Sequence, residues 1–137
     1  MYLPIADPDW VAKVLRETVT QIPRNKIELG IPTFGYEYGA VSASSTAWQQ
    51  EKLRSVTYQS ASELARQVST TPQRNLAGEL MFRYTASTST LPARIVSFPD
   101  ANSTANLITL ARRFRLRGVT IFKLDGESDP NLWQVLR

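Results

Sequence analysis

The chain has 137 residues, of which 42% are hydrophobic and 20% charged, and its formal net charge is +4. This length suffices for one domain with a core of its own, but it is short of the roughly 250 residues of a complete eight-stranded α/β barrel. Because the chain contains no Cys and no His, Ser-His-Asp and Cys-His catalysis are excluded, and we expect no metal and no cofactor.

The first predicted element is an amphipathic helix over residues 10–22. Its apolar residues recur at helical spacing, Asp9 is the expected N-cap, and Pro23 ends the helix. Residues 27–34 then predict a short strand, because they are mostly apolar and Pro32 lies near the end, where a missing ladder donor is tolerated.

The middle of the chain predicts a small α+β segment. Residues 35–52 are rich in Gly, Ala, Ser and Tyr, which is typical of a loop. Ser60 and Glu63 have the spacing of a capping box at the start of a helix. Residues 79–84 and 94–98 flank a Ser/Thr-rich stretch and predict an antiparallel hairpin.

The last third of the chain predicts a helix, a buried strand and a closing helix. Ser103 is the expected cap of the first helix, and Gly118 is expected to end it in the left-handed conformation. Residues 119–124 form the strand, and Asp129 and Pro130 begin the closing helix. The two core strands are joined by a long crossover and are therefore expected to be parallel.

Neither a nucleic acid nor a membrane is expected as a partner. The dense basic run, four Arg residues between positions 112 and 117, lies at a predicted helix end, where cations interact favourably with the dipole. No aromatic-rich RNA-binding sequence accompanies it. No segment approaches the roughly 18 consecutive apolar residues of a membrane span.

Two motifs carry a family resemblance, KIELGIPTFGY at residues 26–36 and GVTIFKLDGE at residues 118–127. They resemble the last two barrel strands of glycoside hydrolase family 18. The similarity extends over about residues 10–133 and is greatest to the branch that contains chitinase-like and spore-cortex lytic enzymes. The chain thus resembles the C-terminal portion of such a catalytic domain.

The resemblance implies an α/β fold that is part of a (β/α)8 TIM barrel. The two motifs are expected to form its last two strands, within a single partial-barrel domain over residues 1–137. Residues 53–98 are expected to form a small α+β insertion subdomain beside the cleft. The parent enzyme is then expected to hydrolyse β-linked N-acetylglucosamine polymers, such as chitin or peptidoglycan.

No catalytic residue is assigned. In this family a Glu after the fourth strand protonates the leaving oxygen, and the substrate's own N-acetyl group attacks the anomeric carbon. Asp7 and Asp9 form the close Asp pair of this chain, but they lie in a helix-capping segment with no Glu after them. We therefore expect the isolated chain to be inactive, and its classification as an enzyme stays open.

Four aromatic residues are candidate substrate-binding residues: Phe34, Tyr36, Tyr38 and Phe122. The family commonly has Trp at the end of the eighth strand, as the floor of the subsite beside the cleaved bond, and Phe122 occupies that position. A core position is the alternative for Phe122 and the preferred interpretation for Phe34. Tyr36 and Tyr38 follow the end of a strand, where barrels carry their sites.

Polar residues near these positions have simpler interpretations. Glu37 is predicted to be a solvated loop carboxylate. Lys123, Asp125 and Glu127 alternate past a strand end, so a salt bridge is expected rather than paired-carboxylate catalysis. Trp48 is compatible both with lining a groove and with anchoring the insertion.

Two other functions remain open. One is a saccharide-binding module without catalysis. The other is a scaffold that self-associates or pairs with the missing barrel half of another chain. The segment 1–8 shows no secretory signal, so the localisation stays open, although the parent family is often secreted or associated with cell walls and spores.

Overall fold

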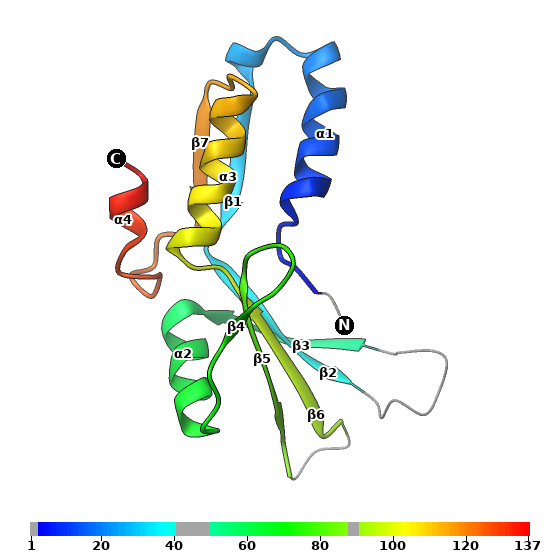
Figure 1. Ribbon diagram of the computed structural model, residues 1–137, viewed down its shortest axis with the longest axis vertical. Coiled ribbons are helices and arrows are strands. Elements are labelled where there is room, and N and C mark those ends of the chain that lie inside the picture. The colour runs from blue at the N-terminus through cyan, green and yellow to red at the C-terminus, as the bar shows by residue number, and fades with distance from the viewer. Residues whose placement is uncertain (1–2, 41–49, 88–90) are drawn as a thin grey trace.

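Two sheets organise the fold, and the chain passes from the first to the second and back (Figure 1). The computed structural model describes residues 3–40, 50–87 and 91–137. Its elements in chain order are α1 (Pro8–Gln21), a 3-10 turn (Arg24–Lys26), β1 (Glu28–Pro32), β2 (Phe34–Ala40), β3 (Gln50–Thr57), α2 (Tyr58–Gln67), β4 (Gln73–Arg74), β5 (Leu80–Thr85), β6 (Ala93–Phe98), α3 (Ala101–Arg113), β7 (Gly118–Phe122) and α4 (Leu132–Val135). The fold is mixed α/β, and the described residues form no closed barrel.

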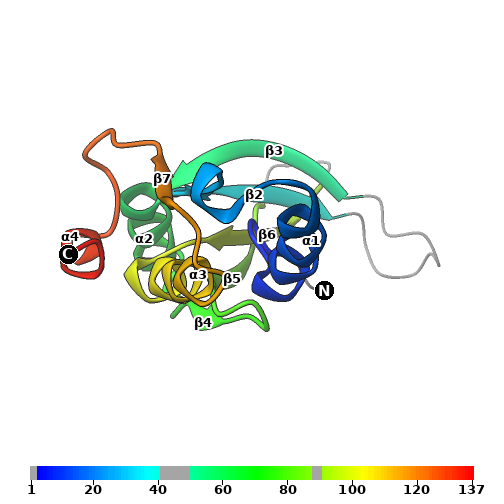
Figure 2. The same cartoon turned by 90° about the horizontal axis from the view of Figure 1, so that it is seen from above.

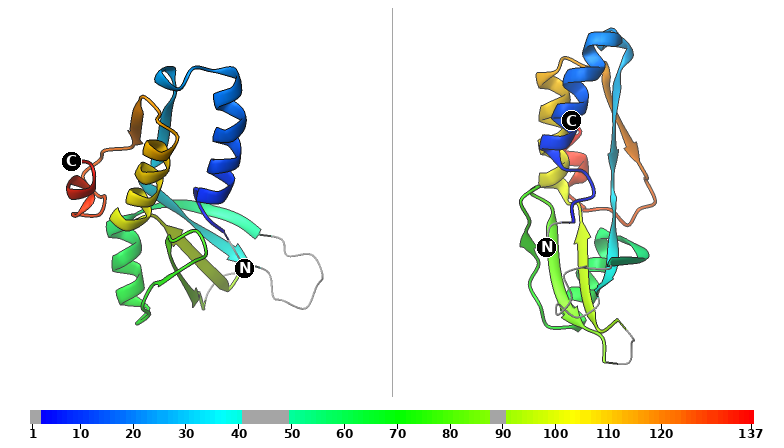
Figure 3. Two further views of the ribbon diagram at one scale, coloured as in Figure 1. Left: turned by 45° about the horizontal axis from the view of Figure 1, so that its top comes forward. Right: turned by 90° about the vertical axis from the view of Figure 1, so that its right-hand side faces the viewer.

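The first sheet is the pair of β1 and β7, which lie parallel and confirm the predicted orientation of the two core strands. Ile31 lies opposite Ile121, and Pro32 lies opposite Phe122. Helices α1 and α3 pack on one side of this pair, as the right-hand view of Figure 3 shows. Side chains on the other face, including those of Thr120 and Phe122, are exposed.

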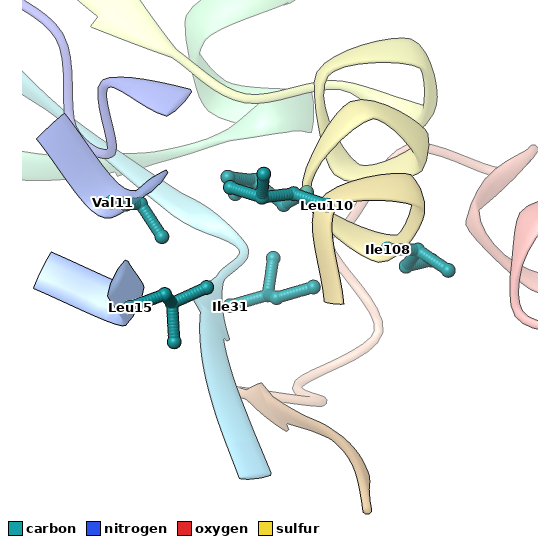
Figure 4. Close-up of a cluster of buried hydrophobic side chains, with 6 residues drawn as sticks. Val11, Leu15, Ile31, Ile108 and Leu110 are labelled. Atoms are coloured by element: carbon teal, nitrogen blue, oxygen red, sulfur yellow. The ribbon is translucent and has the colours of Figure 1, made fainter. Parts of the chain in front are cut away.

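The first hydrophobic core lies between this pair and its two helices (Figure 4). Helix α1, strand β1 and helix α3 all contribute to it, and Ile31 at its centre is 1% exposed. Its buried members are Val11, Leu15, Ile31, Leu107, Ile108 and Leu110. Amphipathic helices covering one face of a parallel pair are the expected arrangement for an α/β protein.

The second sheet has five antiparallel strands in the order β3-β2-β6-β5-β4, with α2 on one face. The β5–β6 hairpin confirms the predicted antiparallel pair and places Phe82 opposite Val96. Seen from above, the long strands β2 and β3 curve beneath the parallel pair (Figure 2). The buried members of the second core are Val56, Ala61, Ala65, Phe82, Val96 and Phe98.

The loop predicted over residues 35–52 is wrong for its two described ends, which belong to β2 and β3. Gly35 and Gly39 belong to strand β2 and not to a loop. They lie on a face of β2 that neighbouring groups approach closely. A Cβ at Gly35 would lie 2.6 Å from Cα of Phe98, so the glycine permits β6 to pack against β2. The antiparallel sheet therefore begins at Phe34, whereas the 53–98 subdomain boundary stays a prediction.

Three helix N-caps differ from the predicted ones. Helix α1 is capped by Asp7 rather than Asp9, so that Pro8 takes the first helical position. Helix α2 is capped by Thr57, and Ser60 closes its capping box. Helix α3 is capped by Asp100, and Ser103 closes the box instead of capping the helix. In each case the predicted residue lies within the first turn of a helix that begins earlier.

Two further differences concern the end of the chain. Gly118 begins β7 and does not end α3; the left-handed residue after α3 is Arg115, with φ of 54°. The closing helix is the short α4, with Asn131 as its N-cap, while Asp129 and Pro130 lie just before it. Over the described ranges, no helix is long and apolar enough to cross a membrane.

Candidate functional site

The site is built where β1 runs into β2 with a single residue, Thr33, between them. The backbone N–H of Thr33 donates to the carbonyl of Phe122 at 2.8 Å. Its hydroxyl accepts from the N–H of Lys123 at 2.9 Å and donates to the carbonyl of Lys123 at 2.5 Å. The end of β7, where the Phe122–Lys123 peptide is cis, is thereby held against the beginning of β2.

This junction brings the four candidate aromatic side chains into one row. The ring centroids of Phe122 and Phe34 are 6.0 Å apart, those of Phe34 and Tyr36 are 5.5 Å apart, and those of Tyr36 and Tyr38 are 6.1 Å apart. All three contacts are edge-to-face, a favourable geometry for aromatic pairs. Phe34, Tyr36 and Tyr38 share one face of β2 because strand side chains alternate. We call Phe122, Phe34, Tyr36 and Tyr38 the aromatic row.

A groove of about 600 Å³ runs along most of this row. Phe34, Tyr36 and Phe122 form its aromatic side, while β3 and the segment after β7 form its polar side. Its lining residues are Phe34, Tyr36, Lys52, Arg54, Ser55, Val56, Thr57, Ser60, Phe122, Lys123 and Glu127. The structure thus combines aromatic surface with hydrogen-bonding and charged groups in one open groove.

The exposure of Phe122 and Phe34 decides between a core position and a position at the groove for each of them. Phe122 is 63% exposed, so a core position for it is wrong. Phe34 is half-buried and lines the groove, so the preferred core interpretation is wrong for it as well. Tyr36 and Tyr38 are half-buried. Burial raises the pKa of Tyr38, with Tyr36 and Glu79 adding to the rise, so its hydroxyl stays protonated.

The cationic side of the groove comes from β3. The ammonium of Lys52 lies 4.1 Å from the ring centroid of Tyr36, a cation–π contact. Arg54 lies directly opposite Glu37 in the β2–β3 pair, with its Nε 2.6 Å from the Glu37 carboxylate. Neither Lys52 nor Arg54 was expected at the site, because the stretch containing Lys52 resembled a loop. No local signal marks this pair, because a register shift between Glu37 and Tyr38 places Arg54 opposite Glu37 and Lys52 opposite Tyr38, on different faces of the strand pair.

Glu37 is buried, so its prediction as a solvated loop carboxylate is wrong. Its carboxylate accepts from Arg54 at 2.6 Å and from the Tyr84 hydroxyl at 2.5 Å, with Arg94 at 3.9 Å. Burial by itself raises the pKa of Glu37, but the hydrogen bonds from Tyr84 and Arg54 and the nearby charges outweigh it and lower the pKa. Glu37 therefore supports the row from the opposite face of β2 as a paired, ionised group.

The salt bridge predicted after β7 is present. The ammonium of Lys123 lies 2.9 Å from Asp125, and the N–H of Glu127 also donates to Asp125. Lys123 lowers the pKa of Asp125. Asp125 and Glu127 are both exposed, as expected.

Two other predictions concern Trp48 and metal binding. Trp48 lies outside the described residues, so both of its interpretations stay open. In the described part of the chain, no three Asp or Glu side chains gather into a group that could hold a metal ion. The groove is lined by aromatic, ammonium, guanidinium, hydroxyl and carboxylate groups.

Comparison with known proteins shows a partial-length similarity to glycosidases. No protein-family model matches the chain. The uncharacterized glycosylase YvbX of Bacillus subtilis is 23% identical over 134 residues, which are 97% of this chain and 36% of YvbX. The spore cortex-lytic enzyme SleL of Bacillus megaterium QM B1551 has a TM-score of 0.80 and 26% identity, over 99% of this chain and 30% of SleL.

A family 18 (GH18) chitinase from Cycas revoluta, solved in complex with (GlcNAc)4, shares the fold with a TM-score of 0.62 and 14% identity, over 87% of this chain and 34% of the chitinase. The predicted resemblance to part of the family 18 enzymes is thus confirmed. The chain spans about a third of the length of these known proteins.

Proposed function

We propose that this chain forms one wall of the saccharide cleft of a family 18 type glycosidase, corresponding to the C-terminal part of its catalytic domain. The substrate class is a β-linked N-acetylglucosamine polymer, such as chitin or peptidoglycan. The aromatic row along the open groove carries this proposal. Sugars present C–H faces that pack on aromatic rings, and the tyrosine hydroxyls add hydrogen-bonding groups.

The position of the row in the fold supports the same function. The row begins at the carboxyl ends of β1 and β7, and in α/β barrels the active site is built at the carboxyl ends of the strands. The 99% coverage of this chain by SleL, at a TM-score of 0.80, is consistent with such a wall. The Cycas chitinase, with the same fold, binds (GlcNAc)4.

The proposal assigns no general acid to this chain. A glycosidase acid needs a raised pKa to be protonated when it acts. The pKa of Glu37 is instead lowered by the hydrogen bonds from Tyr84 and Arg54, and that of Asp125 by Lys123. Glu127 is an exposed loop carboxylate. We therefore expect the isolated chain to bind saccharide without cleaving it.

Binding of (GlcNAc)4 to the chain, measured by calorimetry, tests the proposal. Tyr36→Ala and Phe122→Ala are each expected to weaken binding by about five- to tenfold, since each removes a ring worth roughly 1 kcal/mol of stacking. Trp10→Ala is the matched control, because Trp10 is 63% exposed but lines a different surface, next to α1. Equal affinity in all four proteins, or none, would contradict the proposal.

A hydrolysis assay on the same samples tests the missing acid. We expect no release of shorter oligosaccharides or reducing ends from (GlcNAc)4. Release by the chain, abolished by Glu127→Gln, would show instead that an acid is present. Saturable binding without release is also the result expected for the alternative function, a saccharide-binding module.

A second candidate function, a scaffold that completes a barrel with another chain, has its own supporting observation. Among the described residues β1 and β7 pair only with each other, so each has an unpaired edge. The face that carries Thr120 and Phe122 is also uncovered. Unpaired edges invite strand addition. Sedimentation velocity tests this candidate: a concentration-dependent dimer would support it, and a monomer at high concentration would contradict it.

A further inference from the structure

From the charges around the groove we propose that Lys52 makes this site selective for acidic saccharides, meaning N-acetylated amino-sugar chains that carry carboxylates on their rings. This inference rests on the proposed function, because it assumes that saccharide packs on the aromatic row. Beyond that function, Lys52 is the specificity-determining residue, and it favours anionic over neutral polymers.

Positive charge predominates along the groove. Three of its lining residues are cationic, Lys52, Arg54 and Lys123, and one is anionic, Glu127. Arg54 is partly compensated by Glu37, and Lys123 by Asp125. Lys52 makes its contact with the Tyr36 ring and has no ion pair with a carboxylate in the described part of the chain. The excess positive charge of the groove is therefore concentrated at Lys52.

The Lys52 ammonium is placed where it would meet a bound sugar. It lies over the ring on which a sugar is proposed to pack, 4.1 Å from the Tyr36 centroid. A neutral sugar on that ring has to displace the ammonium and offers no charge in return. A sugar with a carboxylate draws the ammonium off the ring into an ion pair, so the lost contact is replaced by a charge-assisted hydrogen bond.

A second cation of the groove, the guanidinium of Arg54, also belongs to β3. Arg54 is fixed at Nε by Glu37, while its side chain remains 58% exposed. Arg54 is among the residues that line the groove, and a guanidinium fork suits a planar carboxylate. Lys52 and Arg54, both on β3, line the same groove as Tyr36, and Lys52 is the one in contact with the ring. The arrangement fits a carboxylate displaced to one side of a sugar ring.

The test compares two ligands of equal length with the intact chain. One is neutral (GlcNAc)4. The other is a tetrasaccharide in which alternate N-acetylglucosamine rings carry a lactyl ether carboxylate. We expect the acidic ligand to bind about fivefold more tightly at low salt, the size of one solvent-exposed ion pair, and the difference to shrink in high salt.

Lys52→Gln is expected to abolish this preference and to leave binding of the neutral ligand equal or slightly stronger. Lys13→Gln, which removes an exposed charge from α1, is the control and is expected to keep the preference. Equal affinity of the wild-type chain for the two ligands would overturn this inference while leaving the proposed function intact. Binding of neither ligand would overturn both.

Discussion

At the scale of single residues, Glu37 shows how the aromatic row is supported from behind. The row residues Tyr36 and Tyr38 point to one face of β2, and Glu37 between them points to the other. There it joins β3, through Arg54, to β5 and β6, through Tyr84 and Arg94. A buried carboxylate in such a setting holds neighbouring strands in register, because each of its partners loses a hydrogen bond or an ion pair without it.

Glu37→Gln is therefore expected to lower the free energy of unfolding at pH 7 by about 1–3 kcal/mol, since it removes the charge that two arginines surround. The pKa of Glu37 is depressed below its ordinary value of 4.5. Its contribution is thus fully present above that pH and is lost as the pH falls through the folded-state pKa. Urea titrations at pH 7 and pH 3 measure both effects.

Glu63→Gln serves as the control for this change. Glu63 pairs with Arg66 on the surface of α2, and exposed pairs of this kind contribute little. We expect less than about 0.5 kcal/mol for it. Equal effects of the two variants would show that the Glu37 cluster does not support the sheet.

Tyr84 is expected to make the stability of the fold depend on pH in the alkaline range. Burial and the hydrogen bond to Glu37 raise the pKa of Tyr84 to about 12. Because the folded-state pKa is raised, the protonated Tyr84 contributes stability that is fully present below pH 10, the ordinary value. This contribution is lost as the pH rises toward 12. Tyr84→Phe should be less stable at pH 7 and lose less stability than the wild type between pH 9 and pH 11. Parallel losses in both proteins would contradict this assignment.

Gly35 is a residue at which a single methyl group decides the packing. An added Cβ would meet β6 backbone atoms, lying 2.6 Å from Cα of Phe98. Gly35→Ala is expected to destabilise the fold by about 3 kcal/mol or more, because rigid backbone has to move. Gly30→Ala, where nothing lies within 4 Å, is expected to change stability by less than about 0.5 kcal/mol. Thermal unfolding of the two variants measures the difference.

At the scale of elements, two nearby aspartates at the beginning of α1 have different roles. Asp7 accepts from the N–H of Asp9 at 2.8 Å and caps the helix, whereas Asp9 lies in its first turn. Asp7→Ala is expected to cost about 1 kcal/mol, the usual value of an N-cap. Asp9→Ala removes only a favourable charge from the helix end and is expected to cost a few tenths of that. Equal costs in chemical denaturation would place the cap elsewhere.

The elements were predicted well where local signals decide them. The three longer helices follow from apolar spacing, and the β5–β6 hairpin follows from alternation. The predicted caps lie within three residues of the observed ones, because residues of the capping type, Asp, Ser or Thr, occur two or three positions apart at the start of each helix. Strands β2 and β3 were missed because a Gly-rich sequence predicts a loop unless a neighbouring strand is known to pack against it.

At the scale of the whole molecule, a buried carboxylate connects the segment before α1 to the antiparallel sheet. Glu79, just before β5, accepts the N–H groups of Ile5 at 2.8 Å and Ala6 at 2.8 Å, and it also accepts from the Ser97 hydroxyl at 3.2 Å. The segment leading into α1 is thereby bound to the antiparallel sheet.

Glu79→Gln is expected to release that segment, because an amide has one acceptor oxygen and its NH2 group faces donors. Hydrogen exchange measures the result directly: the Ile5 and Ala6 amides should exchange much faster, while the amides of β6 keep their protection. Ser97→Ala, which removes only the hydroxyl contact, should leave Ile5 and Ala6 protected. Unchanged exchange in the Glu79→Gln variant would contradict the connecting role.

The sequence by itself determined the helices, the two parallel core strands, the hairpin and the similarity to part of the family 18 enzymes, because helical spacing, alternation and motifs are local. It also determined which aromatic residues are candidates for saccharide binding. Only the tertiary structure placed Phe122 beside Phe34, buried Glu37, and brought Lys52 over Tyr36. These contacts join residues from different strands, and which side chains face each other across a sheet depends on strand register and the close packing that Gly35 permits.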